Sequence, residues 1–337
     1  MIPIYMIVSD DIVAPASVAM VSILKNTNSF INFILLEKNS LPISRKNIKK
    51  IYQLKKIFPN FSVDIITINV DEFKNLDLSK EKYVPVDTFF RYKIPNLKSN
   101  IAKAIYLDID VVCNKDISSL YDFDLKQHML GAVRNEKGKF MTPTMEKVIS
   151  KTGIKNPYNY FNAGVLLFNC ELCRKNNITE KLFLTTQKNK GKIDYADQDV
   201  LNIVFENSNI ELPGEYNTYP SRINEHDELP TIIHFVGSNK PWKKKCLYDF
   251  VFWQYAKISP FYRKLKKNRE IDSSNSIIKK IYILGVSVLK IVKRQSTIKF
   301  KLFNFIPVLG VKRKAQSTKL YFCNIPIIKI KRKELND

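Results

Sequence analysis

The sequence predicts an α/β fold with a mostly parallel sheet, continued by a basic C-terminal region of a different kind. Apolar runs rich in β-branched residues alternate with segments of helical periodicity through residues 1–240, which is typical of strand–helix–strand units. Acidic pairs follow two of these runs, at Asp10–Asp11 and Asp108–Asp110. Ligands of such sheets bind at the carboxyl ends of the strands, so the two pairs are expected in one cleft. After Tyr255 the alternation stops.

Seven short runs have the composition of strands, being rich in β-branched and aromatic residues. They are Ile4–Val8, Phe30–Leu36, Ser62–Ile68, Ala104–Leu107, Met129–Val133, Val165–Phe168 and Thr231–Phe235. Helices are predicted between the first three strands, at Ala16–Asn26 and Ser44–Phe58. In the second helix Ile48, Ile51, Leu54 and Ile57 recur at helical spacing.

Composition indicates one large domain with an appendage. Of 337 residues, 45% are hydrophobic, which is enough for a sizeable core. The formal charge of +23 is uneven, because residues 261–337 hold 20 Lys and Arg against 4 Asp and Glu. We therefore expect a catalytic domain at residues 1–255 and a basic tail at 256–337, and we look for anionic partners at the tail.

Cysteine usage indicates a reducing compartment. The five cysteines are scattered and odd in number, which does not suit a disulfide framework: Cys113, Cys170, Cys173, Cys246 and Cys323. Cys170 and Cys173 form C-x-x-C without a second pair at zinc spacing, so burial at the end of a strand is the expectation. The chain opens on a strand-like run without a charged leader, which argues against a signal peptide.

The tail predicts an amphipathic helix. Ile277, Ile281, Leu284, Val288 and Ile291 recur at helical spacing, and Lys280, Ser287, Lys290 and Arg294 fall on another face. Such a helix would lie in the interface of an anionic membrane, or it would pack on the catalytic domain with its basic face in water. The longest apolar stretch, Ile281–Leu289, has about half the length that a membrane-spanning helix needs.

The tail also repeats itself. Leu302–Lys314 is echoed 19 residues later by Tyr321–Lys333, each with leading aromatic residues, a central proline and a closing Lys-Arg-Lys. Aromatic and basic residues favour the headgroup region of a membrane, so the two units are candidates for an anchor. The other interpretation is a pair of β-hairpins that extend the core.

Asp108 and Asp110 are the first candidates for chemistry. They end the apolar run Ile105–Leu107 and are one residue apart. Residues i and i+2 of a strand share a face, and ionised carboxylates need a counter-charge when they leave water. A hard cation such as Mg²⁺ or Mn²⁺ prefers carboxylate and phosphate oxygens, so the pair predicts a metal site.

Six blocks in order then resemble glycosyltransferase family 8, the retaining enzymes that use nucleotide sugars and have a GT-A fold. They are Ile7–Asp11, Phe90–Lys93, Tyr106–Asp110, Tyr160–Val165, Tyr195–Asp199 and His234–Trp242. The resemblance covers residues 2–245, and the lipopolysaccharide galactosyl- and glucosyltransferases of bacteria look closest. It implies a Rossmann-like nucleotide-sugar-binding domain.

The resemblance also implies roles for individual residues. Asp108, Asp110 and His234 would hold Mn²⁺ or Mg²⁺. Catalytic roles would fall to Arg91 beside the diphosphate, Asp197 on the donor sugar and Gln198 near the anomeric carbon. The remaining donor-binding positions would be Val8, Asp10, Asp11, Ile109, Asn162, Ala163, Gly237 and Lys240. Ile12 replaces a residue that is often polar in the family, which leaves the ribose contacts open.

The function implied is transfer of galactose or glucose from a UDP-sugar to a lipopolysaccharide- or capsule-type glycan. We expect front-side attack, with double displacement as the other route to retention. The acceptor is expected at Lys137–Tyr158 and Asn217–Glu228. The expected location is the cytoplasm, peripheral on the inner face of the bacterial inner membrane. The alternative is a basic protein without catalysis that binds nucleic acid or an anionic surface, although no nucleic-acid motif is recognisable, and we expect no nucleic-acid partner.

Overall fold

The computed structural model describes residues 1–76, 85–134, 150–224 and 227–274, followed by six strands between residues 278 and 331. Side chains are described as far as residue 269. Residues 137–149 and 225–226 of the expected acceptor region lie outside the described residues. The chain divides into two units, one of residues 1–241 and 245–263, the other of residues 242–244 and 264–337.

The first unit is built on a seven-stranded sheet in the order β3-β2-β1-β4-β7-β6-β8. Its strands are β1 (Ile2–Ile7), β2 (Ile31–Lys38), β3 (Phe61–Ile68), β4 (Lys103–Leu107), β6 (Leu130–Arg134), β7 (Phe161–Asn169) and β8 (Asn209–Glu211). Four neighbouring pairs are parallel, and only the two pairs that involve β7 are antiparallel. The predicted α/β class with a mostly parallel sheet is confirmed.

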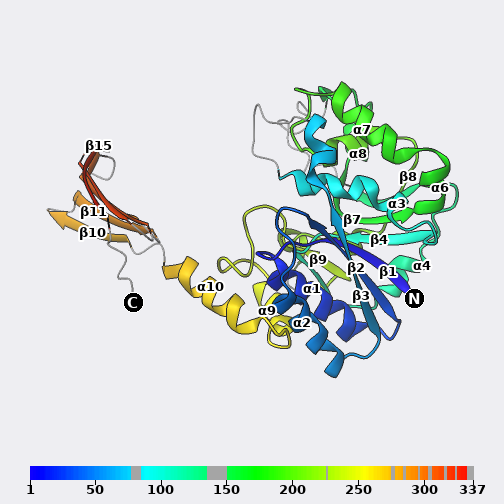
Figure 1. Cartoon of the computed structure of the whole chain (residues 1–337), viewed down its shortest axis with the longest axis horizontal. Helices are drawn as coiled ribbons and strands as arrows, with labels where there is room; N and C mark the ends of the chain where they lie inside the picture. Colours follow the sequence, from blue (N-terminus) through cyan, green and yellow to red (C-terminus); the bar gives the residue numbers. More distant parts are fainter. Residues whose placement is uncertain are drawn as a thin grey trace. The chain divides into compact units, whose positions relative to one another are not determined.

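Helices cover both faces of this sheet (Figure 1). On one side lie α1 (Val13–Asn26), α2 (Arg45–Tyr52) with the 3₁₀ turn η1 (Gln53–Lys56), and α9 (Asp249–Ala256). On the other side lie α3 (Ile94–Leu97), α6 (Cys170–Lys175), α7 (Ile178–Lys188) and α8 (Asp197–Val204). Shorter elements complete the unit: η2 (Val70–Leu76), η3 (Val86–Lys93), α4 (Ser118–Asp122), η4 (Pro157–Asn159), η5 (Gly214–Asn217) and η6 (Pro220–Arg222).

The α7–α8 side packs on the sheet through one apolar cluster, which includes Phe90, Tyr106, Phe161, Phe168 and Phe205. Each of these side chains is at most 1% exposed, and burying an aromatic side chain stabilises the fold by about 1.5–3 kcal/mol. The predicted burial of Cys170 and Cys173 is confirmed, since both thiols lie in this cluster. Helix α2 begins where expected, because Ser44 caps it by accepting a hydrogen bond from the Asn47 amide.

A second, two-stranded sheet pairs β5 (Val111–Cys113) with β9 (Ile232–His234) in antiparallel register. Val111 lies opposite His234. The backbone amide of Phe235 donates to the Asp110 carbonyl at 2.9 Å, which extends the pairing by one residue. The sequence did not predict β5. This strand follows the acidic pair directly and connects it, by pairing with β9, to His234.

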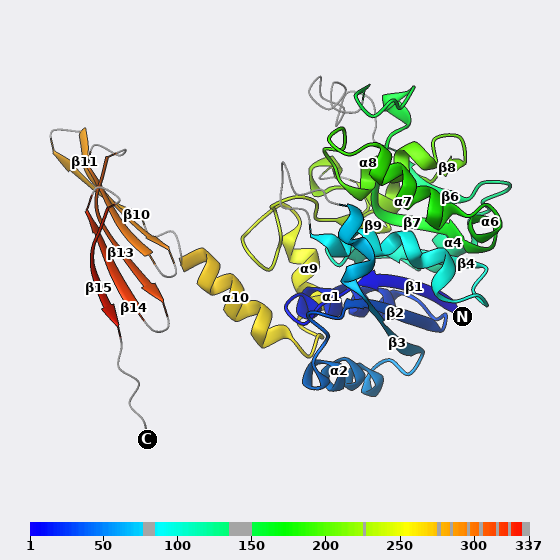
Figure 2. The ribbon, with the colours of Figure 1, turned by 45° about the horizontal axis from the view of Figure 1, so that its top comes forward.

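The second unit contains helix α10 (Tyr262–Ser274) in part, and six antiparallel strands in sequence order (Figure 2). They are β10 (Ile278–Ile283), β11 (Val286–Arg294), β12 (Thr297–Leu302), β13 (Ile306–Lys314), β14 (Ser317–Phe322) and β15 (Ile325–Lys331). The amphipathic helix predicted from Ile281, Val288 and Ile291 is therefore wrong, and Ile277 and Leu284 lie outside the described residues. Ile281, Val288 and Ile291 are β-branched and so also suit a strand, and pairing with the later strands selects the extended conformation.

The six strands form three similar hairpins. A register shift occurs at the corresponding place in each, after Ile281, Phe300 and Leu320. The second and third hairpins contain the two repeats that the sequence shows, and β10–β11 is a third copy that sequence comparison missed. The hairpin conformation of the repeat is confirmed as far as these residues are described, whereas the anchor role and the extension of the core stay predictions.

The strand register divides the sheet into two unlike faces. Directly opposed residues and alternate residues along a strand share a face. One face holds the rows Ile291–Phe300–Leu309–Phe322 and Ile298–Val311–Leu320–Ile328. The other face, here called the basic face, holds Lys280, Lys290, Arg294, Lys299, Lys301, Lys312, Lys314, Lys319, Lys329 and Lys331. Lys279, Lys293 and Arg313 fall on the apolar face.

Candidate active and metal site

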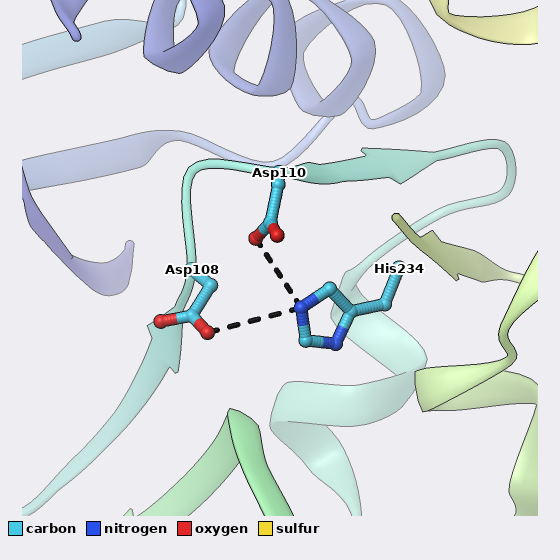
Figure 3. Close-up of side chains that lie close together, drawn as sticks. All are labelled: Asp108, Asp110 and His234. Carbon is cyan, nitrogen blue, oxygen red and sulfur yellow. Dashed lines mark ion pairs between the residues drawn. The ribbon is translucent and has the colours of Figure 1, made fainter. Parts of the chain in front are cut away.

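The acidic pair and His234 meet where the two sheets of the first unit adjoin. Asp108 follows β4, and its backbone amide donates to the Gly164 carbonyl in β7 at 2.8 Å. Asp110 precedes β5, whose pairing with β9 places His234 beside it. Thus three side chains from two stretches of the chain, 108–110 and β9, converge (Figure 3).

Their ligand atoms have the spacing of a cation site. One donor atom each from Asp108, Asp110 and His234 lies within 4.8 Å of the others. His234 Nε2 is 3.2 Å from Asp110 Oδ1 and 3.8 Å from Asp108 Oδ2. Two carboxylates and an imidazole suit Mn²⁺ or Mg²⁺ in chemistry, and the residues present fit such a group.

Asp110 is held ionised. Burial raises the pKa of a carboxyl, but His234 and Lys240 outweigh burial here and keep the Asp110 pKa well below its usual range. Lys240 pairs with Asp110 Oδ2 and also donates to the Phe235 carbonyl at 2.7 Å. Lys240, which the resemblance places on the phosphates, therefore lies within reach of the cation site and contacts a ligand residue.

Gly164 is required by the close approach of His234. A Cβ atom at position 164 would lie 2.1 Å from His234 Cε1 and 2.8 Å from Asp108 Oδ2. No side chain fits at such distances, so any other residue would displace the imidazole. The glycine of the Tyr160–Val165 block thus serves the geometry of the metal site.

Arg91 connects the cation site to Asp197. Its side chain is 6% exposed and projects from η3 under β4. Arg91 Nη1 donates to the Ala163 carbonyl at 2.6 Å, Nη2 lies 3.3 Å from Asp108 Oδ1, and Nε lies 3.0 Å from Asp197 Oδ2. The guanidinium also stacks over Tyr106, whose hydroxyl donates to Asp108 Oδ1 at 2.5 Å. Burial lowers the pKa of Arg91, but Asp197 and the other neighbours outweigh it, so the group stays cationic.

Asp197 begins helix α8 and has unused acceptor capacity. It is 5% exposed, and burial raises its pKa despite the neighbouring Arg91. Thr88 donates to Oδ1 at 2.6 Å, whereas Oδ2 has the ion pair but accepts no hydrogen bond from any described residue. The residue before it, Ala196, has φ 53° and ψ −126°, a conformation that L-residues rarely adopt. Such strain is common at functional sites.

Polar side chains beside Asp197 are joined to one another. Asn162 Nδ2 donates to Gln198 Oε1 at 3.0 Å, and Gln198 Nε2 donates to the Tyr160 hydroxyl at 3.1 Å. The Tyr160 hydroxyl donates to Asp199 at 2.6 Å. Asn217 connects this group to His234, whose Nδ1 lies 2.8 Å from Asn217 Oδ1.

The remaining predicted positions lie at strand ends around this site. Val8 is buried after β1, and Asp10 Oδ1 accepts hydrogen bonds from the Ser44 amide and Asn47 Nδ2, both at 2.7 Å. Asp11 accepts from the Ser9 hydroxyl at 2.5 Å. Ile109 separates the two aspartates, and Ala163 uses its backbone toward Arg91 and Gln198. Gly237 has φ 68°, as expected for a glycine turn.

Three residues of the site were missed by sequence reasoning. Asn217, Tyr160 and Asp199 are each at most 1% exposed. Asn217 is hydrogen-bonded to His234 and Tyr160 to Gln198, and Asp199 accepts from Tyr160. Tyr160 and Asp199 lie inside quoted blocks, so their polar character within apolar surroundings was the available signal. Asn217 carries no such signal, because its partner His234 is distant in sequence.

Comparison with known proteins agrees with this geometry. The family model "Glycosyl transferase family 8" matches residues 3–246. Lipopolysaccharide 1,2-glucosyltransferase of Escherichia coli is 31% identical over 172 residues, which are 47% of this chain and 48% of that protein. Lipopolysaccharide 1,3-galactosyltransferase of Salmonella typhimurium is 27% identical over 220 residues, 62% of each. The chain thus spans less than two thirds of either relative.

Solved structures show the same fold. The galactosyltransferase LgtC, solved in complex with donor and acceptor sugar analogs, superposes with a TM-score of 0.65. It is 24% identical, and the match covers 77% of this chain and 96% of that one. The first unit accordingly has the GT-A fold, as the sequence predicted. Since the family model covers well over half of the chain, the chain belongs to glycosyl transferase family 8.

Proposed function

We propose that this protein transfers a hexose, galactose or glucose, from a UDP-sugar to a lipopolysaccharide- or capsule-type glycan, with retention of configuration and with a divalent cation. The observation that supports this most directly is the convergence of Asp108, Asp110 and His234 beside Arg91. The two lipopolysaccharide transferases among its relatives support the hexose and the kind of acceptor.

Bond cleavage at the anomeric carbon leaves negative charge on the departing diphosphate. Asp108, Asp110 and His234 would hold Mn²⁺ or Mg²⁺, which supplies Lewis-acid stabilisation of that charge when bound. Lys240 adds a positive charge within reach of the same site. Val8 and Asp10 line the strand end where the nucleoside would lie, and Asp11, Ile109 and Gly237 would complete that binding region.

The donor sugar would lie over Asp197 and Asn162. Asp197 Oδ2 is buried but has unused acceptor capacity that a sugar hydroxyl could fill, because it accepts no hydrogen bond from the described protein. Arg91 holds this carboxylate in place and extends toward Asp108, so one side chain aligns the sugar-binding and cation-binding groups.

Front-side attack fits the state of Gln198. Its Oε1 accepts hydrogen bonds from Asn162 Nδ2 at 3.0 Å and from the Ala163 amide at 3.1 Å. An amide oxygen with both lone pairs engaged is a poor nucleophile. In the proposed step the acceptor hydroxyl bonds to the anomeric carbon as the bond to the diphosphate oxygen breaks, and its proton passes to that oxygen.

A donor-hydrolysis assay tests the proposal. Purified protein is incubated with UDP-galactose, UDP-glucose or UDP-N-acetylglucosamine, with Mn²⁺ or with a chelator, and released UDP is measured. We expect metal-dependent release from one of the first two donors, and its loss in Asp110→Ala. Undiminished hydrolysis in that variant would refute the metal assignment, and a glycosyl adduct trapped on Asp197 or Gln198 would refute front-side attack.

We further propose that the basic face of the C-terminal sheet binds anionic lipid headgroups, which would place the enzyme on the inner face of the inner membrane. The supporting observation is the segregation of Lys and Arg by the strand register. A lysine near an anionic surface adds about 1 kcal/mol of binding. Among the described residues no helix is both long enough and apolar enough to cross a bilayer.

Two triple variants of equal charge test the role of the face. Lys290→Ser/Lys301→Ser/Lys319→Ser removes cations from the basic face, and Lys279→Ser/Lys293→Ser/Arg313→Ser removes as many from the opposite face. In flotation with phosphatidylglycerol-containing vesicles, the first variant should lose binding and the second should keep most of it. Equal losses would contradict the face assignment. Preference for duplex DNA over the vesicles would favour the nucleic-acid alternative.

A further inference from the structure

We propose that Asn217 is a positioning residue for the metal ligand His234. It holds the imidazole in the tautomer whose Nε2 is free to bind a cation, and a chain of hydrogen bonds through Asn162 and Gln198 orients it. This inference rests on the proposed function, since it concerns the same cation site. It adds a role for residues that do not themselves contact the cation.

The orientation of each amide follows from backbone donors, whose identity is not ambiguous. The Gly164 amide lies 2.9 Å from the Asn162 side chain, so the atom it meets there must be the acceptor Oδ1. The Asn217 atom 3.0 Å from the same oxygen must then be the donor Nδ2. Asn217 therefore presents its oxygen to His234.

The Asn217 oxygen determines which ring nitrogen of His234 carries the hydrogen. Asn217 Oδ1 lies 2.8 Å from His234 Nδ1 and can only accept, so Nδ1 carries the hydrogen. Nε2 is then the nitrogen that faces the Asp108 and Asp110 carboxylates. A proton occupies it in the absence of a cation, and its lone pair is available once a cation replaces that proton. Metal-binding histidines generally donate their other N–H to such a partner, which fixes ring and tautomer together.

The directions of the hydrogen bonds at the Asp199 end of this series are assigned in the same way. The Ala163 amide lies 3.1 Å from Gln198 Oε1, which makes that atom the acceptor and leaves Nε2 to donate to the Tyr160 hydroxyl. The Tyr160 hydrogen goes to Asp199, whose other oxygen accepts from the Asp194 and Tyr195 amides at 2.8 Å each. All hydrogen bonds in the series from His234 to Tyr160 are thus donated in one direction, which ends at the buried Asp199 carboxylate.

Burial makes this arrangement hard to replace. His234 is 2% exposed, Asn217 and Tyr160 are 1% exposed, and Asp199 is fully buried. Water cannot readily take over a missing partner at such positions, and hydrogen bonds in series strengthen one another at low local dielectric. Loss of the Asn217 oxygen would leave Nδ1–H unpaired and allow the ring to turn or to change tautomer.

The first test reads the tautomer without metal or substrate. The chain has three histidines, so ¹⁵N-histidine labelling gives few ring signals, and His234→Gln identifies those of His234. We expect ¹⁵N shifts that place a hydrogen on Nδ1 in the metal-free wild type, whether or not Nε2 carries one, and shifts of the Nε2–H tautomer in Asn217→Leu. An Nε2–H tautomer in the wild type would overturn the inference, whether or not the protein is a transferase.

The second test measures the affinity for Mn²⁺ by electron paramagnetic resonance, with no donor sugar present. Asn217→Leu should raise the Kd by about 10- to 100-fold, the usual effect of losing such a partner. Asn217→Asp should restore most of the affinity, because a carboxylate oxygen still accepts from Nδ1. Tyr160→Phe, which removes the last link, should raise the Kd by a smaller factor.

Asn209→Leu is the matched control. Asn209 is another buried amide, 7% exposed, and it bonds to backbone carbonyls of Phe205 and Glu206 outside the site. Its loss should lower thermal stability and leave the Kd for Mn²⁺ unchanged. Equal Kd values for Asn217→Leu and wild type would overturn the inference. Absence of Mn²⁺ binding by the wild type would instead count against the proposed function, and the tautomer would still decide the role of Asn217.

Discussion

Arg91 and Asp197 form an ion pair in the interior of the first unit, with Nε 3.0 Å from Oδ2. The two side chains are 7% and 6% exposed, so each charge depends on the other. Because Arg91 also reaches Asp108, this pair connects the start of α8 to the end of β4. It therefore sets the distance between the sugar-facing and cation-facing groups.

Breaking this pair should be costly. We expect Asp197→Leu or Arg91→Met to lower the free energy of unfolding by about 3–5 kcal/mol, because one buried charge is left alone. The double variant should recover part of the loss, and urea denaturation measures all four proteins. The partly exposed pair of Lys98 and Asp64 is the control. Lys98→Met should cost below about 1 kcal/mol, and equal costs at both pairs would contradict the interpretation.

Gly164→Ala should weaken metal binding strongly while the fold survives. The added methyl group would overlap His234 Cε1, so the ring must move away from Asp108 and Asp110. We expect the Mn²⁺ affinity to fall by about 100-fold, as when the support of a ligand is lost. Titration followed by electron paramagnetic resonance measures it.

Gly214→Ala provides the comparison for that change. A Cβ at position 214 meets no atom within 4 Å, and its backbone is not in the left-handed region. Affinity and circular dichroism should match the wild type. If both alanine variants bound Mn²⁺ normally, the close approach at Gly164 would not govern the site.

Lys240→Met separates the two roles of this lysine. Without the ammonium group, Asp110 loses a competing partner, so Mn²⁺ should bind about tenfold more tightly in the absence of donor. The KM for the UDP-sugar should rise, because a charge near the diphosphate is gone. Isothermal titration with Mn²⁺ and steady-state kinetics measure the two effects. A weaker affinity for Mn²⁺ would show that Lys240 supports the cation site rather than competing for Asp110.

Alkaline pH should unfold the first unit through its buried thiols. Burial raises the pKa of Cys113 and of Cys170 to about 12, from an ordinary value of 9.0. The unfolded chain therefore loses these protons first as the pH rises, so stability is full below pH 9 and falls above it. Each thiol should remove about 1.4 kcal/mol per pH unit until its folded pKa is reached.

Urea denaturation across this pH range checks the effect. Cys113→Ala should flatten the decline by the contribution of one thiol, whereas Cys246→Ala, at a partly exposed position, should leave the slope unchanged. The same burial should protect Cys113 and Cys170 from maleimide in the folded protein. An unchanged slope in Cys113→Ala would contradict the assigned pKa.

Much of the first unit could be predicted, because its strands and helices are indicated by residues that lie close together in the sequence. The alternation of apolar runs identified six of the seven strands of the large sheet, all but β8, together with β9. Asp108 and Asp110 do converge, although they lie in a turn after β4 and not within a strand. The pairing of β5 with β9 could not be predicted, because three residues on each side carry no periodic signal and the partners are distant in sequence. Only the family resemblance connected His234 to the acidic pair.

The tail shows the opposite limit. Ile281, Val288 and Ile291 satisfy the spacing of a helix, but as β-branched residues they also favour strands. Local sequence does not decide between them, because strand pairing is a tertiary effect that outweighs propensity. The orientation of the Asn217 side chain could not be predicted either. It depends on Asn162, whose own orientation is set by the Gly164 backbone amide, and only the fold brings these residues together.

The three-residue pairing of β5 with β9 also sets when this site can exist during synthesis. His234 is made 126 residues after Asp108, so the acidic pair has left the ribosome long before its imidazole partner is available. A chain released before β9 keeps both carboxylates and lacks the third ligand. Cation affinity would therefore report that translation has passed β9 and that β9 has paired with β5, and products truncated before β9 would lack the complete site.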